Sequence, residues 1–135
     1  MQVNSIMDIQ AADCMSGFKI SADGKICAKF IFPADFIGFQ GHFPDKPILP
    51  GICKILAVKA MLQRYYNRKL YIRQIVTAKF FAPVACGDEL LIECRKKDEN
   101  ADGICIVNAL VTCRGDKISK IELKIEKTGD DFATP

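Results

Sequence analysis

A chain of 135 residues, half of them hydrophobic, suits one compact domain with a substantial core. The formal net charge of +3 is modest, and no Lys/Arg block with interleaved aromatic residues appears, which argues against a nucleic-acid-binding protein. No apolar run is long enough for a transmembrane helix, and residues 1–14 lack the pattern of a signal peptide. We therefore expect a single domain, residues 1–135, in the cytoplasm and away from membranes.

The seven cysteines are odd in number, scattered singly and never arranged as CxxC pairs. This pattern favours reduced thiols over a disulfide framework. Cys105 and Cys113 lie in apolar strand patterns, where a free cysteine behaves as a small hydrophobic residue. With only one histidine in the chain, we expect no metal site and no cofactor.

The first recognisable element is a β-hairpin. Asp23-Gly24 separates two alternating segments, Phe18–Ser21 and Lys25–Phe32, and an Asp-Gly step between such segments is a strong hairpin signal. We therefore expect the fold to open with sheet. Next comes the stretch GHFPDKPILPG, residues 41–51, whose prolines each fix φ and restrict the preceding residue. It predicts a rigid loop.

A long helix is predicted directly after this loop. Residues Ile52–Tyr66 contain no Gly or Pro and exceed the length of an ordinary strand. Lys54 and Lys59 are the only charged residues among its first eleven positions, so the helix is apolar on nearly every side. Such a helix must be covered from several directions, by a wrapped sheet or by a partner chain.

Four further strands follow the helix. They are expected at Tyr71–Pro83, Glu89–Lys97, Ile104–Cys113 and Ile118–Glu126, and the last alternates apolar and charged residues. The turns between them are too short for crossover helices, so consecutive strands should be antiparallel. The sum is an α+β domain with one long helix, about six antiparallel strands, and a polar tail over about residues 128–135.

The rigid loop and the start of the helix together suggest a catalytic site. The N–H groups near Gly51, Ile52 and Cys53 have no partner within the helix and point back toward the loop, where they form a site for a partial negative charge such as a thioester carbonyl oxygen. His42, the only histidine, titrates near neutrality and is a candidate general base. A structural histidine, hydrogen-bonded to backbone within a tight turn, is the alternative reading of the same residue.

GHFPDKPILPG resembles the signature of the hot-dog-fold (3R)-hydroxyacyl-acyl-carrier-protein dehydratases of the FabZ and FabA type, G-H-F-P-x-x-P-x-x-P-G followed by a central helix. KFFAPVACGDELLIE, residues 79–93, resembles a later strand pair of that family. The similarity extends roughly from Lys25 to Lys127. The N-terminal part departs from the family, whose usual opening segment is missing here.

The resemblance implies a hot-dog fold, with the sheet wrapped around the central helix, and a homodimer or larger homo-oligomer whose active sites lie between subunits. It implies that His42 is the base and that the backbone N–H at Gly51 polarises the thioester carbonyl. It further implies acyl carrier protein or a coenzyme A thioester as partner. We take the substrate-binding candidates to be Phe43, Pro50, Ile52 and Leu56, and the basic residues able to meet an acidic carrier to be Arg64, Arg68, Lys69, Arg73 and Lys79.

One family residue is absent. The family places a carboxylate fourteen residues after the histidine, on the helix of the other subunit, and here that position is Leu56, with Ala60 where a glutamine is usual. Loss of a positioned acid usually costs about 10²–10⁴ in rate. Asp45, Asp88 and Glu89 are poorly placed substitutes, being in the loop or at a turn.

Three interpretations remain open. The chain is a dehydratase-like hydro-lyase that uses another acid, which is the reading we favour. Alternatively, it is the half of a heteromer whose acid comes from a paralogous hot-dog partner. In the third reading it is an acyl-thioester-binding module, or a thioesterase that uses His42 and the Gly51 donor with water; Leu56 would then be core or acyl-chain lining.

Overall fold

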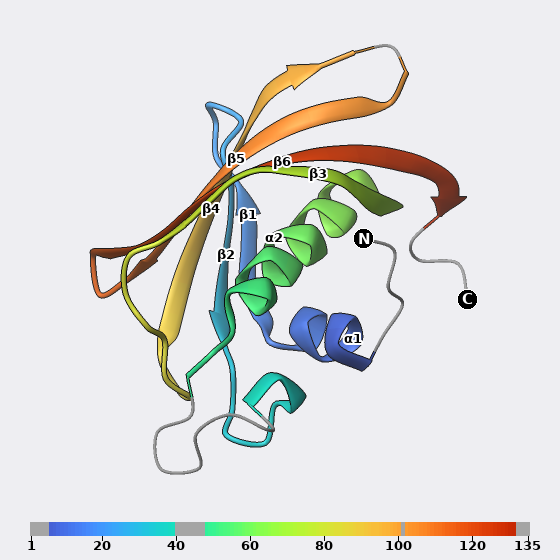
Figure 1. Ribbon diagram of the computed structural model, residues 1–135. Helices are drawn as coiled ribbons and strands as arrows, with labels where there is room; N and C mark the ends of the chain where they lie inside the picture. The colour runs from blue at the N-terminus through green and yellow to red at the C-terminus, as the bar shows by residue number, and fades with distance from the viewer. Residues whose placement is uncertain (1–5, 40–47, 101, 132–135) are drawn as a thin grey trace.

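The computed structural model describes residues 6–39, 48–100 and 102–131. Figure 1 shows a strongly twisted sheet curving over one long helix. In chain order the elements are α1 (Ile6–Asp13), β1 (Met15–Ile20), β2 (Ile26–Ile31), the 3₁₀ turn η1 (Ile37–Phe39), α2 (Gly51–Tyr66), β3 (Arg68–Phe80), β4 (Glu89–Glu99), β5 (Ile104–Cys113) and β6 (Asp116–Asp131).

The six strands form one sheet in the order β1-β2-β4-β5-β6-β3, and every neighbouring pair is antiparallel. The chain enters the sheet through the predicted hairpin, in which the Ser21 N–H donates to the Lys25 carbonyl at 2.9 Å and Gly24 adopts a φ of 88°. The short turns predicted after α2 are present, so the antiparallel topology is confirmed.

Helix α2 is buried along most of its length. Residues 53–62 are all buried, and the two lysines among them, Lys54 and Lys59, are only 3% and 5% exposed. The sheet supplies the opposing surface through alternate side chains, on β6 through Ile121, Leu123 and Ile125. Each such aliphatic side chain contributes about 1.5–3 kcal/mol when removed from water. The covered helix that its apolar pattern predicted is therefore confirmed.

The C-terminal end of α2 turns directly into β3. Asn67 adopts the left-handed conformation, with φ 54° and ψ 44°, and its N–H donates to the Gln63 carbonyl. The Gln63 side-chain oxygen accepts from the Leu70 N–H at 3.1 Å. These contacts satisfy the last turn and reverse the chain, which places β3 along the edge of the sheet beside β6.

The N-terminal region differs from the sequence prediction. A helix, α1, precedes the hairpin, so the fold does not open with sheet. This helix is short and only Ala11 in it is buried, so its sequence carries little of the periodic signal that predicts helices. It is held by tertiary contacts: Asp8 pairs with Lys59 of α2 at 3.7 Å, and the Gln10 side chain accepts from the Ile37 N–H at 2.9 Å.

Several strand boundaries also differ. β3 ends at Phe80 rather than Pro83, since proline offers no N–H to a ladder. β6 is longer at both ends than the expected Ile118–Glu126 and continues through the first residues of the expected polar tail. Among the helices of the described residues, none is long and apolar enough to cross a membrane.

Candidate functional site at the start of helix α2

The chain is fixed to the sheet just before α2 begins. The Leu49 N–H donates to the Val84 carbonyl at 2.8 Å, and Ile48 bridges Ala85. Pro50 then enters the helix with φ −59° and ψ 148°. His42 and Phe43 lie outside the described residues, so their roles stay predictions. The structure therefore describes the helix side of the candidate site.

The first turn of α2 retains backbone donors. Pro50 is the N-cap and makes no side-chain capping bond, while the Cys53 N–H donates to the Pro50 carbonyl at 3.0 Å. Among the described residues, no acceptor is recorded for the N–H groups of Gly51 and Ile52. Of the three donors expected from sequence, Cys53 is thus already used. The other two leave room for a carbonyl oxygen at the positive end of the helix dipole.

Gly51 is in close contact with an aromatic ring. A Cβ atom built on Gly51 would lie 2.7 Å from Cζ of Phe80 and 3.0 Å from its Cε2. Phe80 is the last residue of β3, and 47% of its surface is exposed. Only glycine therefore allows the ring to lie against the helix start, and a ligand reaching the Gly51 N–H would meet this ring.

Lys54 contacts the same ring. Its Nζ is 5.1 Å from the centroid of Phe80, and the residue is 3% exposed. Among the described residues no carboxylate forms an ion pair with it, whereas Lys59, the other buried lysine of α2, pairs with Asp8. Burial lowers the pKa of Lys54, and the adjacent Cys53 opposes this only in part. Among the described residues, the recorded neighbour of this buried cation is thus the face of the Phe80 ring.

Ser119 is a second buried polar group at this place. It pairs with Phe80 across β3 and β6, so the two side chains share one face of the sheet. Ser119 is fully buried, and its hydroxyl has no hydrogen-bond partner among the described residues. Buried hydroxyls are rarely left unpaired. Lys54 and Ser119 are therefore two buried polar groups that lie next to the Phe80 ring and have no polar partner among the described residues.

The remaining candidates fall into two groups. Pro50 and Ile52 are half-buried at the helix start, whereas Leu56 and Ala60 are each 4% exposed and leave no carboxyl group at the family position. Asp88 is engaged in its own turn, where its Oδ2 accepts from the Ala85 N–H at 2.9 Å and its Oδ1 lies 3.8 Å from Arg114. It does not replace the missing acid.

Cysteine chemistry is disfavoured at this site. Burial raises the pKa of Cys53 to about 11, and its Sγ contacts the Met7 sulfur at 3.7 Å. All seven cysteines are free, which confirms the reading of the sequence pattern as reduced thiols. Within the described residues, no group of His, Cys, Asp and Glu side chains is arranged to hold a metal ion.

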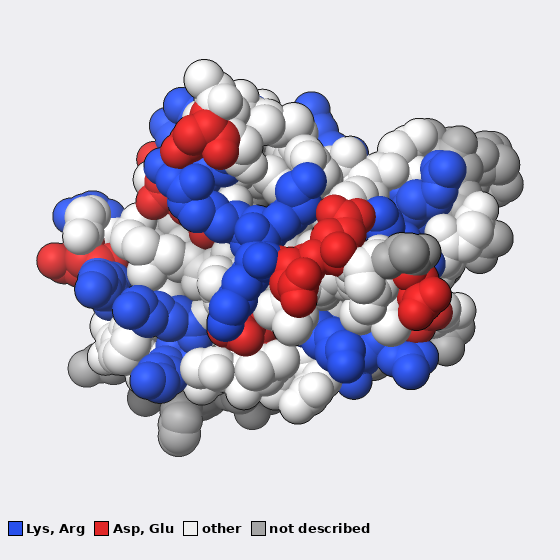
Figure 2. All heavy atoms as spheres, turned by 90° about the horizontal axis from the view of Figure 1, so that it is seen from above, with Lys and Arg blue, Asp and Glu red and all other residues white. Residues whose placement is uncertain are grey.

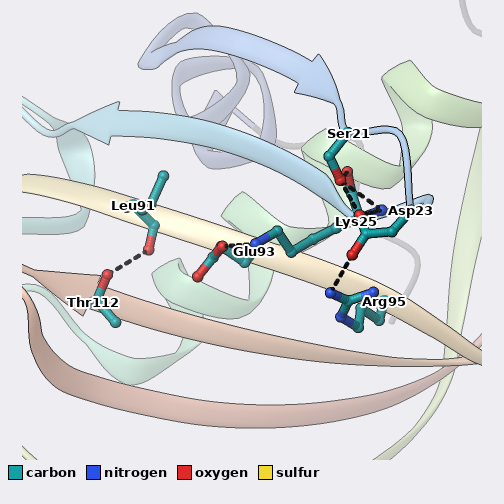
Figure 3. A network of polar contacts seen from close by, with 7 residues as sticks. All are labelled: Ser21, Asp23, Lys25, Leu91, Glu93, Arg95 and Thr112. Atoms are coloured by element: carbon teal, nitrogen blue, oxygen red, sulfur yellow. Dashed lines mark hydrogen bonds and ion pairs between the residues drawn. The ribbon is translucent and has the colours of Figure 1, made fainter.

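The outer face of the sheet carries a separate polar groove of about 530 Å³. Lys25 pairs with Glu93 at 2.5 Å and Arg95 with Asp23 at 2.8 Å, and Figure 3 shows these side chains in front of the sheet with α2 behind it. The Ser21 hydroxyl and Arg95 hold the pKa of Asp23 well below its usual range. Lys and Arg side chains lie beside acidic ones across this face (Figure 2).

The basic residues expected to meet a carrier protein do not form one patch. Arg68 and Lys79 lie near opposite ends of the long strand β3. Arg73 is paired with Glu126 at 2.8 Å, and the Arg64 guanidinium lies 4.6 Å from the Phe18 ring. Lys79 is exposed, directly precedes Phe80, and lies opposite Lys120 on β6. Of the five, Lys79 is the one adjacent in sequence to a residue of the candidate site.

Comparisons with known proteins agree with this architecture. The family model described as ApeI-like, ApeI dehydratase, matches residues 19–120. A 3-hydroxyacyl-acyl-carrier-protein dehydratase FabZ of Vibrio cholerae is 33% identical over 95 residues, which are 64% of this chain and 61% of that protein. The match thus spans about three fifths of the length of this curated relative.

Solved structures resemble the whole described architecture. The dehydratase heterocomplex ApeI:P from Xenorhabdus doucetiae matches with a TM-score of 0.67 at 19% identity, over 84% of this chain and 96% of that one. A hypothetical thioesterase with coenzyme A from Streptococcus pneumoniae matches with a TM-score of 0.65 at 11% identity, over 93% and 96% of the two chains. At such identities the likeness concerns the fold, and it confirms the predicted α+β hot-dog fold.

Proposed function

Because the chain belongs to the ApeI-like dehydratase family, we propose that it is a hydro-lyase that removes water from 3-hydroxyacyl thioesters. The observation that carries this proposal is the start of α2. There the N–H groups of Gly51 and Ile52 have no acceptor among the described residues and lie at the positive end of a 16-residue helix. If the carbonyl oxygen of a thioester substrate were bound there, these N–H groups would stabilise the negative charge of the enolate. The C2 proton of the substrate would therefore be more acidic.

In this proposal His42 is the base. The prolines that follow it, Pro44, Pro47 and Pro50, restrict the loop, so the imidazole would be held near the helix start with little reorganisation. It would take the C2 proton of the substrate while the C3 hydroxyl departs as water. Phe43, Pro50, Ile52 and Leu56 would contact the acyl thioester, Leu56 as an apolar surface for the chain.

A heteromeric enzyme is the second candidate, and Leu56 is the observation that favours it. A buried leucine stands where the family carboxylate is expected, so a partner bearing an acid would complete the site. The structurally similar complex from Xenorhabdus doucetiae is itself named a dehydratase heterocomplex. In this version His42 would face the acid of a paralogous hot-dog chain across the interface.

The thioester carrier is proposed to be acyl carrier protein, with coenzyme A as the alternative. Lys79 and Lys120 lie opposite each other on the outer face of the sheet, where they line the polar groove, and they offer positive charge with no ion-pair partner among the described residues. An acidic carrier protein would complement that charge. The seven free thiols suit a reducing compartment, and we place the activity in the cytoplasm.

The test is a substrate comparison with the purified chain, alone and coexpressed with a paralogous hot-dog protein bearing the acid. Formation of a 2-enoyl thioester from a 3-hydroxyacyl thioester by the chain alone supports a dehydratase that needs no paralogue. The same product only with the paralogue supports the heteromer. Release of free thiol from saturated acyl thioesters, without loss of water, would show a thioesterase instead. Saturable binding without any product would show a binding module.

A further inference from the structure

We propose that Lys54 is the proton donor to the departing hydroxyl group, in place of the carboxylic acid missing at Leu56. This inference deepens the proposed function and rests on it. Lys54 lies three residues after Gly51, so the two residues share one side of α2, about 4.5 Å apart along the helix axis. The Lys54 side chain therefore belongs to the same end of α2 as the proposed carbonyl site.

The burial of Lys54 calls for an explanation. Its ammonium is withdrawn from water and contacts the face of Phe80, 5.1 Å from the ring centroid, with no carboxylate paired to it among the described residues. A cation–π contact recovers only part of the cost of burying a charge. A lysine that serves only the core would be exchanged for an aliphatic residue without loss. An unpaired buried cation is instead suited to a ligand that develops negative charge.

Lys59 provides an internal comparison. It lies on the same helix, is buried to the same degree, and is paired with Asp8 of α1. Its charge is therefore accounted for by the fold itself. Lys54 differs from it in contacting Phe80, the ring that lies against Gly51, and no ion-pair partner of Lys54 is found among the described residues. The lysine without an ion-pair partner among the described residues is therefore the one that lies at the candidate site.

The proposed step balances as follows. His42 removes the C2 proton, and the electrons of that C–H bond form the C2–C3 double bond. The C3–O bond breaks with its electron pair on oxygen, which takes a proton from the Lys54 ammonium and leaves as water. The enzyme is left with an imidazolium and a neutral amine, and a proton returns from one to the other through solvent. No oxidant, metal or cofactor enters the step.

The electrostatic surroundings favour a donor at Lys54. Burial moves its pKa down, toward the range in which an acid transfers its proton readily. Among the described residues, the thiol of Cys53 is the titratable group that acts on the Lys54 ammonium. Burial raises the pKa of that thiol to about 11, so the thiol is neutral near pH 7. Asp8, on the helix that packs against α2, is paired with Lys59. Ser119, facing the same ring from β6, does not titrate in this range.

The test measures 2-enoyl thioester formation by Lys54→Met, Lys54→Arg and the matched control Lys59→Met, using a 3-hydroxyacyl coenzyme A and the same assembly that is active for the wild type. We expect Lys54→Met to lower kcat by about 10²-fold or more, the usual loss for a general acid. Lys54→Arg keeps the positive charge but cannot donate a proton near neutral pH, so its kcat should fall similarly with little change in KM. Lys59→Met should retain kcat within a few-fold.

Two further readouts separate a proton donor from a structural residue. The kcat of the wild type should fall as pH rises through the pKa of Lys54, and Lys54→Arg should lack this alkaline limb. Lys54→Met should have a Tm at least equal to that of the wild type, because it removes an unpaired buried charge. Lys59→Met should have a lower Tm, because it leaves Asp8 without its lysine.

Each outcome decides the proposal. If the wild type is active and Lys54→Met is equally active, the donor role is overturned and the dehydratase function stands. If Lys54→Met is inactive only because it no longer forms the wild-type oligomer, as measured by light scattering, Lys54 is an interface residue and the donor role is again overturned. If the wild type forms no 2-enoyl thioester in any assembly, the proposed function fails and this inference fails with it.

Discussion

The two ends of helix α2 differ in how their polar groups are satisfied. At the C-terminal end, the Asn67 N–H donates to the Gln63 carbonyl, and the Gln63 side chain accepts from Leu70. At the N-terminal end there is no side-chain cap, and a lysine and a serine are buried without polar partners in the described part of the chain. One end is built for stability, and the other carries a cost in stability that binding of a ligand would offset.

The comparison predicts that substitutions at the two ends separate activity from stability. The largest effect is expected from His42→Asn in the loop before α2, which removes the titrating group while keeping a similar size and polarity. We expect kcat to fall by about 10²–10⁴ because the general base is lost. A steady-state assay of 2-enoyl product measures it. If His42 is instead structural, kcat will be retained while Tm falls.

Gly51→Ala tests the backbone contact at the helix start. The new methyl group would lie 2.7 Å from the Phe80 ring, which must shift, and it occupies space that the thioester carbonyl needs. We expect kcat/KM to fall by about 10²-fold, the scale of losing an oxyanion donor. The free energy of unfolding should change by no more than about 1 kcal/mol, since alanine favours helix over glycine.

The double variant Gly51→Ala, Phe80→Leu identifies the cause of that loss. A smaller side chain at position 80 removes the crowding against the new methyl group. If activity returns, the displaced ring caused the defect and the Gly51 N–H is not itself essential. If activity stays low, the methyl group obstructs the approach to the backbone donor, as the proposed function requires.

Lys79→Glu tests whether the surface that binds the acyl carrier protein includes Lys79. It reverses one of two adjacent charges on the outer face of the sheet that have no ion-pair partner among the described residues. We expect KM for an acyl-carrier-protein substrate to rise several-fold at low salt, with the difference shrinking as salt is added, because exposed charges are screened. KM for a coenzyme A substrate should change less. Lys69→Glu, near the other end of β3, is the matched control and should leave both KM values unchanged.

The smallest effect on activity is expected at the C-terminal end of α2. Asn67→Ala places an alanine at φ 54°, which should lower the free energy of unfolding by about 1 kcal/mol and Tm by a few degrees. Asn67→Gly should be close to neutral. Thermal unfolding and the enoyl assay, run together, measure both quantities. A large loss of activity in Asn67→Ala would contradict the proposal that the C-terminal end of α2 serves stability while its N-terminal end serves activity.

Stability should also depend on pH through Lys54. Burial lowers its pKa in the folded protein below the ordinary value near 10.4, so the unfolded chain binds more protons between those two values. The contribution of Lys54 to stability therefore rises with pH across that window, and the destabilisation is fully present below it. Thermal melts of the wild type and Lys54→Met over this range should show the difference closing as pH increases.

Much of the architecture followed from local sequence patterns. The Asp23-Gly24 turn, the uninterrupted apolar stretch after Gly51 and the alternation through Ile121, Leu123 and Ile125 each correspond to an element of the structure. These signals are strong because each depends on residues close together in the chain. Helix α1 gave no such signal, since it is held mainly by distant partners, Lys59 through Asp8 and Ile37 through Gln10.

The candidate site was predicted as a loop and a set of backbone donors, without the buried side chains next to them. The prolines that follow His42 and the glycine at the helix start predicted the loop and the donor at Gly51. The sequence did mark Lys54 as unusual, because it is a charged residue in a helix that is apolar on nearly every side. Ser119 had none, because a serine in an alternating strand is usual, and its burial beside Phe80 depends on the pairing of β3 with β6.

The sequence by itself determined the central helix, the succession of strands along the chain from the hairpin onward and the absence of a carboxylate at position 56, because these are properties of composition and of neighbours along the chain. Only the tertiary structure decided that Phe80 covers Gly51, that Lys59 pairs with Asp8, and that within the described residues Lys54 and the Ser119 hydroxyl are buried without a polar partner. The physical reason is that burial and charge pairing depend on which distant segments fold together.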